Sequence, residues 1–509
     1  MRWACLAGSL MLLFWPGAGQ AKWLRASSAH FVIYADDAER NVRRFSDQLE
    51  RYHAAVLLMS GRKEAPPSPS NRVAVYVLPT STALRNLFGP ENKNYAGRYM
   101  ARAAGSVAFL SAVSPGKGKV DFSMAVLLHE YAHHLMHSLS GQPMPRWMSE
   151  GGAEFYAASS FGGDGSVTLG GTAWYRVGGL LYGPGLRVEE LLDDRRDQEK
   201  TLAKGNVFYG RSWLLFHYLS FDQARKGQLA KYLALLAGGT AARPAAEQAF
   251  GDLASLNRDL DSYQKRTRID AVRLPPDLLS PGAIDVRPLG PGEAAMMPVR
   301  VRSAYGVDAA GAKALVAEAR AIAARFPADP AVLSALAEAE YDAGNDKEAI
   351  AAADAALAVD PAQVNAYVQK GYALFRRAES ADDRAAAYAL ARAPFIALNR
   401  LENDHPLPLI YFYRSYVDQG LPPPPLALAG LVRALELAPF DDGLRMTLAS
   451  ALLAGKRQAD ARIVLGPVAY DPHGGELAEQ ARKMLARLDR EPGWTGEDPP
   501  ETAEPATAQ

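Results

Sequence analysis

The spacing of hydrophobic positions changes along the chain and divides it into regions. From residue 22 to about residue 268, short apolar runs rich in β-branched and aromatic residues alternate with stretches of helical spacing, and helical spacing dominates after residue 120. Strands placed early and helices placed later predict an α+β domain over residues 22–268. Three runs are typical of strands: His30–Ala35, Arg72–Leu78 and Gly105–Val113.

Residues 269–308 differ from both neighbouring regions because proline and glycine are frequent there. Two short pieces, IDVRPL from Ile284 and PVRVRS from Pro298, alternate apolar and polar residues as strands do. We therefore expect a linker that contains short strands and forms a small hairpin.

Residues 309–490 are rich in alanine and repeat with a period of about 34 residues. Pro327 and Pro361 are one period apart, and each follows a stretch of helical spacing. The pattern is typical of tetratricopeptide repeats, in which small residues let paired helices approach closely. An all-α solenoid of three to four imperfect repeats is expected, one of them interrupted by LPPPPL; the alternative is a non-repeating helical bundle. The residues that recur after one period are Leu333 and Tyr367, Ala337 and Gly371, and Tyr341 and Phe375.

The two ends of the chain have their own composition. Residues 1–21 contain Arg2, an apolar run and a small-residue end at Ala21, which is the layout of a cleaved secretory signal peptide. Its apolar run is shorter than the ~20 residues that span a bilayer, so we expect no membrane span in the mature chain. Residues 491–509 are rich in proline and acidic residues and are expected to be disordered.

Charge and cysteine content narrow the function classes. The chain has 56 basic and 56 acidic residues, so no net basic surface indicates nucleic-acid binding. The single cysteine, Cys5, lies inside the expected signal peptide. A mature chain without disulfides that is secreted or periplasmic in a bacterium would have to be stabilised by core burial.

Four of the nine histidines lie between Val126 and Leu139, in the stretch VLLHEYAHHLMHSL. His129 and His133 are four residues apart, so on a helix both imidazoles point the same way and can bind one zinc ion. Glu130 follows the first histidine and is placed to act as a general base. An amphipathic helix with a histidine-rich polar face is the alternative interpretation.

A third metal ligand is expected downstream. Glu150, in RWMSEGGAEFYA, lies sixteen residues after His133, and a helix–turn–helix of that length can return its carboxylate to the histidines. Glu154, one turn further, shares that helix face and could accept the ring N–H of a ligand histidine. Neither His134 nor His137 is well placed as a ligand. Met136 and Leu139 stand where the metzincin pattern requires glycine and histidine, which excludes that class.

The segments HEYAH and WMSEGGAEFYA together resemble the gluzincins, zinc peptidases with two histidines and a downstream glutamate, and in particular the secreted bacterial peptidase-MA-like group. The resemblance extends over about residues 23–268 and implies a tyrosine that stabilises the oxyanion. Tyr209 in FYGRSWLLFHYL matches that position, although Arg211 and Ser212 stand where lysine and glycine are usual; Tyr175 and Tyr182 are weaker candidates.

The segment that binds a substrate's free amine in aminopeptidase members has no counterpart here. GSVAFLSAV occupies its place without an acidic residue, and as an edge strand it could hold an extended peptide by main-chain hydrogen bonds. Endopeptidase and exopeptidase activity therefore both stay open.

Two functions follow from these features. The first is a secreted zinc peptidase that cleaves a peptide or protein substrate and binds a protein partner through its repeats. The second is an inactive envelope scaffold that acts through the repeats alone. An intact Glu130 favours the first, because a purely structural zinc site does not need a general base.

Overall fold

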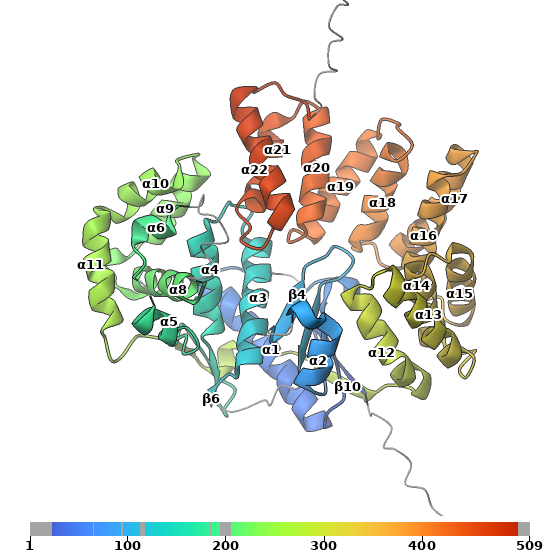
Figure 1. The fold of residues 1–509 in the computed structure, drawn as a ribbon, viewed down its shortest axis with the longest axis horizontal. Helices are drawn as coiled ribbons and strands as arrows, with labels where there is room; N and C mark the ends of the chain where they lie inside the picture. Colours follow the sequence, from blue (N-terminus) through green and yellow to red (C-terminus); the bar gives the residue numbers. More distant parts are fainter. Residues whose placement is uncertain are drawn as a thin grey trace, which may run out of the picture.

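The computed structural model describes residues 23–64, 66–92, 95–111, 118–183, 185–193 and 205–496. The amino-terminal half contains two β-sheets and a group of helices, and the carboxy-terminal half is an array of helices (Figure 1). The expected signal peptide lies outside the described residues.

The larger sheet has six strands in the order β10-β1-β2-β3-β5-β4. Strands β2, β3 and β5 are parallel to one another, whereas β1, β10 and β4 are antiparallel to their neighbours. The three strands expected from the sequence are therefore confirmed as β2, β3 and β5. The strands are β1 (Leu24–Ser27), β2 (Phe31–Ala35), β3 (Val73–Leu78), β4 (Gly97–Met100), β5 (Val107–Ser111) and β10 (Asp285–Pro288).

Both faces of this sheet are buried, which explains its almost continuous apolar strands. Along β3, Val75 and Val77 pack under α1 (Glu39–Ser60) and α3 (Phe122–Leu139), on one face. Tyr76 and Leu78 alternate to the other face, where α2 (Ser81–Phe88) and α12 (Pro291–Tyr305) cover them. Helix α3, which carries the histidines, is thus fixed against the sheet.

A smaller antiparallel sheet has the order β6-β7-β8-β9, and a group of helices lies beside it. Helix α4 packs on α8 from this group, and the large apolar core between them includes Trp147, Trp213 and Tyr232. The elements are β6 (Gly118–Lys119), β7 (Ser160–Phe161), β8 (Val167–Leu169), β9 (Val272–Leu274), α4 (Arg146–Ala157), α5 (Val177–Tyr182), α6 (Val188–Leu191), α8 (Gly205–Phe221), α9 (Gln228–Ala237), α10 (Ala242–Phe250) and α11 (Leu253–Gln264). Short 3₁₀ turns are η1 (Pro69–Asn71), η2 (Pro90–Asn92), η3 (Gln223–Arg225) and η4 (Pro276–Leu278).

The carboxy-terminal half forms consecutive helix pairs, and this arrangement fits the expected tetratricopeptide pattern. Gly371 of α16 lies against the ring of Phe395 on α17 with no room for a side chain, so the small residues do allow close helix approach. The helices are α13 (Ala309–Ala323), α14 (Pro330–Asp342), α15 (Asp346–Val359), α16 (Val364–Glu379), α17 (Arg384–Leu401), α18 (Pro406–Val417), α19 (Pro425–Leu437), α20 (Asp442–Ala454), α21 (Gln458–Ala469) and α22 (Gly475–Arg490).

The region expected to be a linker is part of the fold. Ile284–Leu289 contains β10 as expected, but β10 pairs with β1 rather than with a hairpin partner. The prediction of a strand at Pro298–Ser303 is wrong, because these residues lie in α12. Met296 and Val299 of α12 face the core of the repeat array, and Met297 and Val301 face the sheet. Because this helix is buried on two sides, apolar residues are needed on both. Along the sequence they therefore alternate locally with polar residues, as they do in a strand.

Two further expectations need correction. Gly105–Val113 is not an edge strand, because β4 pairs along the outer side of β5 and forms the edge itself. In the tail, Trp494 packs against the last helices, with the Arg487 guanidinium 4.9 Å from its ring centre, so Glu491–Gly496 is ordered; residues 497–509 lie outside the described residues. Among the described residues, no helix is both long and apolar enough to cross a membrane.

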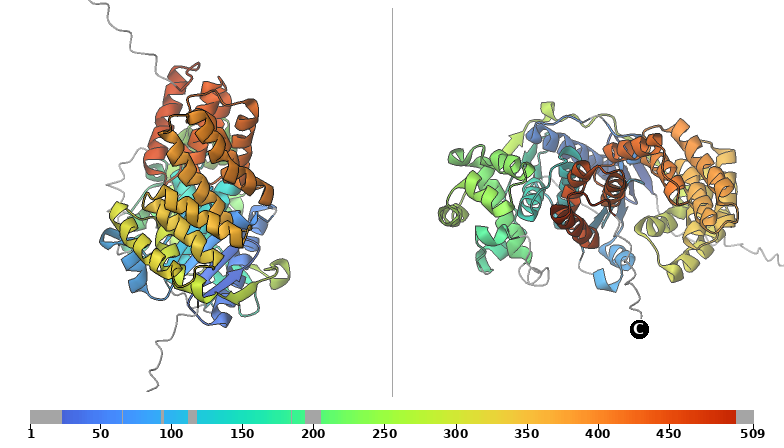
Figure 2. Two further views of the ribbon diagram at one scale, coloured as in Figure 1. Left: turned by 90° about the vertical axis from the view of Figure 1, so that its right-hand side faces the viewer. Right: turned by 90° about the horizontal axis from the view of Figure 1, so that it is seen from above.

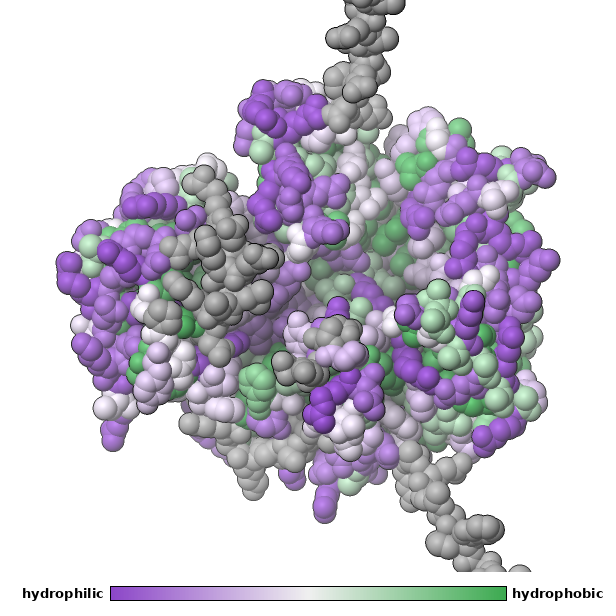
Figure 3. Space-filling model, in the orientation of Figure 1, coloured by the Kyte–Doolittle hydropathy of each residue, from purple (hydrophilic) through white to green (hydrophobic). Residues whose placement is uncertain are grey.

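The helical array curves back over the amino-terminal domain. Helices α20–α22 therefore lie above α3, between the helices α5–α11 on one side and the first helices of the array on the other (Figures 1 and 2). The face drawn in Figure 3 is hollowed near its middle, between these carboxy-terminal helices and the rest of the array. The array and the domain also bond directly: Ala103 donates its backbone N–H to Asp441 at 2.7 Å, and Ser70 donates to Glu402 at 2.8 Å.

Candidate metal centre

Helix α3 holds two histidines in fixed positions. Asp121 caps the helix by accepting the backbone N–H of Met124 at 2.8 Å, which satisfies one of the free donors of the first turn. Leu128 and Leu135 are fully buried under the sheet and anchor the helix. His129 and His133 project from an adjacent face and are themselves buried. The packing of α3 therefore fixes where both imidazoles point.

Helix α4 brings Glu150 to these imidazoles because two glycines let it approach its neighbours. A Cβ at Gly151 would collide with the backbone carbonyl of Ser212 on α8, and a Cβ at Gly152 would lie 3.0 Å from the sulfur of Met136 on α3. Neither contact leaves room for a larger residue. The Gly-Gly pair after Glu150 thus serves helix packing, and Glu150 is completely buried as a result.

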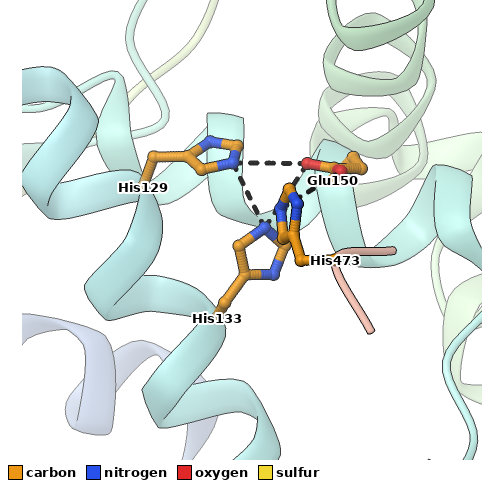
Figure 4. A group of neighbouring side chains, drawn as sticks. All are labelled: His129, His133, Glu150 and His473. Atoms are coloured by element: carbon orange, nitrogen blue, oxygen red, sulfur yellow. Dashed lines mark hydrogen bonds and ion pairs between the residues drawn. The ribbon is translucent and has the colours of Figure 1, made fainter. Parts of the chain in front are cut away.

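Three donor atoms meet at one point (Figure 4). Nε2 of His129 lies 3.2 Å from Nε2 of His133 and 3.2 Å from Oε2 of Glu150, and Nε2 of His133 lies 3.4 Å from the same oxygen. Ligands at about 2.0–2.1 Å from a tetrahedral zinc ion are separated by roughly 3.3 Å. The three separations match the edges of such a tetrahedron, so the residues present fit a zinc ion.

The polar groups of this cluster lack the partners that buried groups normally have. Among the described residues, neither carboxylate oxygen of Glu150 accepts a hydrogen bond of good geometry, and Nδ1 of His129 also has none. A buried carboxylate without a donor is costly unless a cation compensates it. The cluster could therefore hold a cation.

The charges around the cluster indicate the same preference for a cation. Burial alone would lower the pKa of His129, but the carboxylates of Glu154, Glu150 and Glu130 outweigh it and raise the pKa to about 9. Burial would likewise raise the pKa of Glu150, but the charge of His473 and the close contacts with the imidazoles of His129 and His133 hold it well below its ordinary value. The carboxylates around His129 therefore favour positive charge on that imidazole.

A second row of side chains orients the imidazoles. Oε1 of Glu154 lies 3.4 Å from Nδ1 of His129, and Arg176 donates to the same oxygen at 2.7 and 2.9 Å. Ser149 Oγ lies 3.1 Å from Nδ1 of His133. Both Nε2 atoms are thereby left to face the common point, as a metal site requires.

A fourth donor joins the cluster from the other half of the chain. Nε2 of His473, in the turn between α21 and α22, lies 3.5 Å from Oε1 of Glu150, and one donor atom from each of His129, His133, Glu150 and His473 lies within 4.8 Å of the others (Figure 4). This residue was not expected from the sequence. In the sequence, His473 appears only as a histidine in the turn DPHGG. Nothing in that turn indicates a contact with α3 or α4.

The remaining candidates take distinct places. Glu130 is half-buried beside His129, close enough for its charge to act on that imidazole. The ring of Tyr209 lies 6.2 Å from the ring of His129, and the Arg176 guanidinium stacks 4.6 Å from the tyrosine ring centre. Tyr182 is 88% exposed, whereas burial and the charge of Glu154 both raise the pKa of Tyr175.

Two other histidines of α3 do not join the donor group. His134 Nδ1 bonds to the hydroxyl of Tyr99 at 2.8 Å, and its ring lies 4.2 Å from the ring of Phe440 in the helical array. Burial lowers the pKa of His134 to about 3 and that of His137 to about 4, so both are neutral. They belong to the contact between α3 and the array.

No protein-family model matches the chain, and no curated protein matches it either. Among solved structures, it is similar to a thermophilic TPR protein in Thermus thermophilus, with 19% sequence identity and a TM-score of 0.31. The match covers 34% of this chain and 91% of that chain. The amino-terminal domain and its cluster are therefore interpreted from their own geometry.

Proposed function

We propose that the chain is a secreted or periplasmic zinc-dependent peptidase whose helical repeats bind a protein partner or substrate. The observation that carries the proposal is Glu150, a fully buried carboxylate at tetrahedral distances from two imidazoles that accepts no hydrogen bond of good geometry from the part of the chain that the structure describes. His129, His133 and Glu150 would hold the metal. Two imidazoles and one carboxylate form the donor set of catalytic zinc in gluzincin-type peptidases.

The neighbouring residues supply the rest of the chemistry. A bound zinc ion would polarise the scissile carbonyl and acidify water. Glu130, beside His129 and only half-buried, would take the proton of the attacking water and pass it to the leaving amine. Tyr209 would donate its hydroxyl to the developing oxyanion; burial and the charge of Glu150 raise its pKa, so the hydroxyl keeps its proton.

The sheet offers a place for an extended substrate. Strand β4 is the edge of the six-stranded sheet and lies beside α3, with Tyr99 of β4 bonded to His134 of α3. An extended peptide could add to this edge by main-chain hydrogen bonds and pass close to the cluster. In this proposal, the edge strand β4 would bind the extended peptide in place of Gly105–Val113.

A second candidate function is supported by His473. Structural zinc sites have four protein ligands, whereas catalytic sites keep one position open. With His473 as a fourth donor, the cluster also fits a structural zinc ion that ties the array to the amino-terminal domain in a scaffold protein.

Hydrolysis separates the two candidates. The purified chain is loaded with one equivalent of Zn²⁺ and incubated with a quenched fluorescent peptide library and with unfolded casein. Peptide cleavage that a chelator abolishes and added zinc restores supports the peptidase. No cleavage by a chain that holds stoichiometric zinc contradicts it and favours the scaffold.

A further inference from the structure

The fourth donor of the cluster differs from the other three in how it is held. The side chains of His129, His133 and Glu150 are 10%, 8% and 0% exposed, whereas that of His473 is 45% exposed. The two buried histidines face Oε2 of Glu150, and His473 faces Oε1. His473 therefore approaches the cluster from the solvent side and lies beside the second carboxylate oxygen of Glu150.

The turn that carries His473 is short and shaped by its own residues. Asp471 accepts the backbone N–H of His473 at 2.7 Å, and Gly475 adopts a left-handed backbone conformation with φ 51°. The turn connects α21 to α22, so the position of the imidazole depends on where these two helices lie.

Contacts between the array and the domain set the place of these helices. Gly466 of α21 packs against Pro143 in the loop between α3 and α4. The contact is so close that a Cβ at Gly466 would collide with the proline ring. Phe440 covers His134, and Asp441 accepts the backbone N–H of Ala103 beside β5. These contacts lie on the array side of α3, whereas the core that fixes α3 lies between this helix and the sheet. The helices α20–α22 can thus leave α3 without disrupting the three buried donors.

We propose that His473 is a latch: it fills the fourth position of the metal site while α20–α22 lie against α3, and the site becomes accessible to substrate when they move away. The inference rests on the proposed peptidase function. It explains why a cluster with a general base at hand also has a fourth protein donor, because a catalytic site needs that position for water or substrate. The closed chain is then the inactive state of the enzyme.

Cobalt spectroscopy tests the ligand separately from activity. The chain is loaded with one equivalent of Co²⁺, and the visible absorption is compared between wild type and H473A, with H137A as the matched control. His137 lies in the same contact, 6.5 Å from the ring of His133, but outside the donor group. We expect H473A alone to change the spectrum and to weaken Zn²⁺ affinity by about tenfold or more.

Activity then tests the latch. H473A is expected to cleave peptides at least about tenfold faster than wild type. An unchanged cobalt spectrum in H473A overturns the inference whatever the activity shows. If the cobalt spectrum of H473A changes but neither wild type nor H473A cleaves peptides, both the latch and the peptidase are overturned, and a structural zinc site remains. A changed spectrum with equal cleavage rates overturns the latch alone.

A disulfide can hold the latch closed. A Cβ built at Gly466 lies 3.7 Å from Cβ of Pro143, within the 3.5–4.5 Å range of disulfides, and the chain after Cys5 contains no other cysteine. Oxidised P143C/G466C is expected to lose about tenfold or more of the wild-type cleavage rate and to recover it on reduction, with P143C as the control. Oxidised P143C/G466C/H473A is expected to stay active. Loss of activity in this triple variant would show that the turn merely covers the site, and would overturn the latch.

Discussion

Two buried glutamates show how differently the two halves of the chain use the same side chain. In the array, Glu340 is 3% exposed and accepts two hydrogen bonds from Arg320, at 2.6 and 2.7 Å, and a third from Asn345 at 2.8 Å. In the domain, Glu150 is 0% exposed, lies 3.2–3.5 Å from three imidazoles and accepts no hydrogen bond of good geometry from the described residues. A satisfied carboxylate stabilises a fold, whereas an unsatisfied one among imidazoles indicates a missing cation.

The largest expected effect is on metal binding. E150A should lose stoichiometric zinc, with affinity reduced by more than the ~10–100-fold that loss of an outer partner costs, because a direct ligand is removed. E340A should bind zinc as wild type does but lower the free energy of unfolding by ~1–3 kcal/mol, since its charged hydrogen bonds are lost. Metal analysis and urea denaturation measure the two quantities. Full zinc occupancy in E150A would show that Glu150 is not a ligand.

The next effect concerns turnover without metal loss. E130Q should keep one zinc per chain and reduce kcat by ~10²–10⁴-fold, because the amide cannot accept the proton of the attacking water. The rate is measured as steady-state cleavage of a fluorescent peptide by E130Q/H473A and by H473A. Metal analysis of both proteins gives the zinc occupancy. Undiminished cleavage by E130Q would remove Glu130 from the mechanism.

A smaller loss is expected when the support behind a ligand is removed. E154Q keeps the shape but loses the charge that faces Nδ1 of His129 and pairs with Arg176. Zinc affinity should fall by ~10–100-fold. Glu293 pairs with Arg287 and Arg300 far along the chain, and E293Q is the matched control with unchanged affinity. Equal affinities in E154Q and wild type would show that Glu154 serves only packing.

The smallest effect concerns the helix approach that places Glu150. G151A puts a methyl group against the backbone of Ser212 and should lower the free energy of unfolding by ~1–3 kcal/mol. Gly141, whose Cβ would meet nothing within 4 Å, is the control, and G141A should change stability by less than ~0.5 kcal/mol. Similar stability of the two variants, measured by thermal denaturation, would refute the close-approach role of Gly151.

The sequence reveals the parts of the site that depend on local geometry. His129 and His133 share a helix face because of their spacing. Glu150 lies in the next helix, after a short loop, so the convergence of the three side chains is predictable without a tertiary structure. His473 is not predictable in this way. Its place depends on how a stack of helix pairs curves back to α3, which no local pattern records.

The same limit explains the errors in the fold. Alternating apolar residues in α12 look like a strand because the helix packs on the sheet with one side and on the array with the other. Strand β4 has only four residues, one of them glycine, and it is less apolar than β5, so the sequence gives little sign that it forms the edge beside β5. Both errors arise where burial on two sides, rather than intrinsic propensity, decides the structure.

X-ray absorption at the zinc K-edge tests the central claim most directly, because it reports the ligands of the bound metal in the intact chain. The purified protein with one equivalent of Zn²⁺ is predicted to show a first shell of about four nitrogen and oxygen atoms at ~2.0–2.1 Å, with the outer-shell signal of imidazole. That signal should weaken in H473A and disappear in H129A/H133A. A chain that retains no zinc, or a shell of about six oxygens without an imidazole signal, would contradict the metal centre.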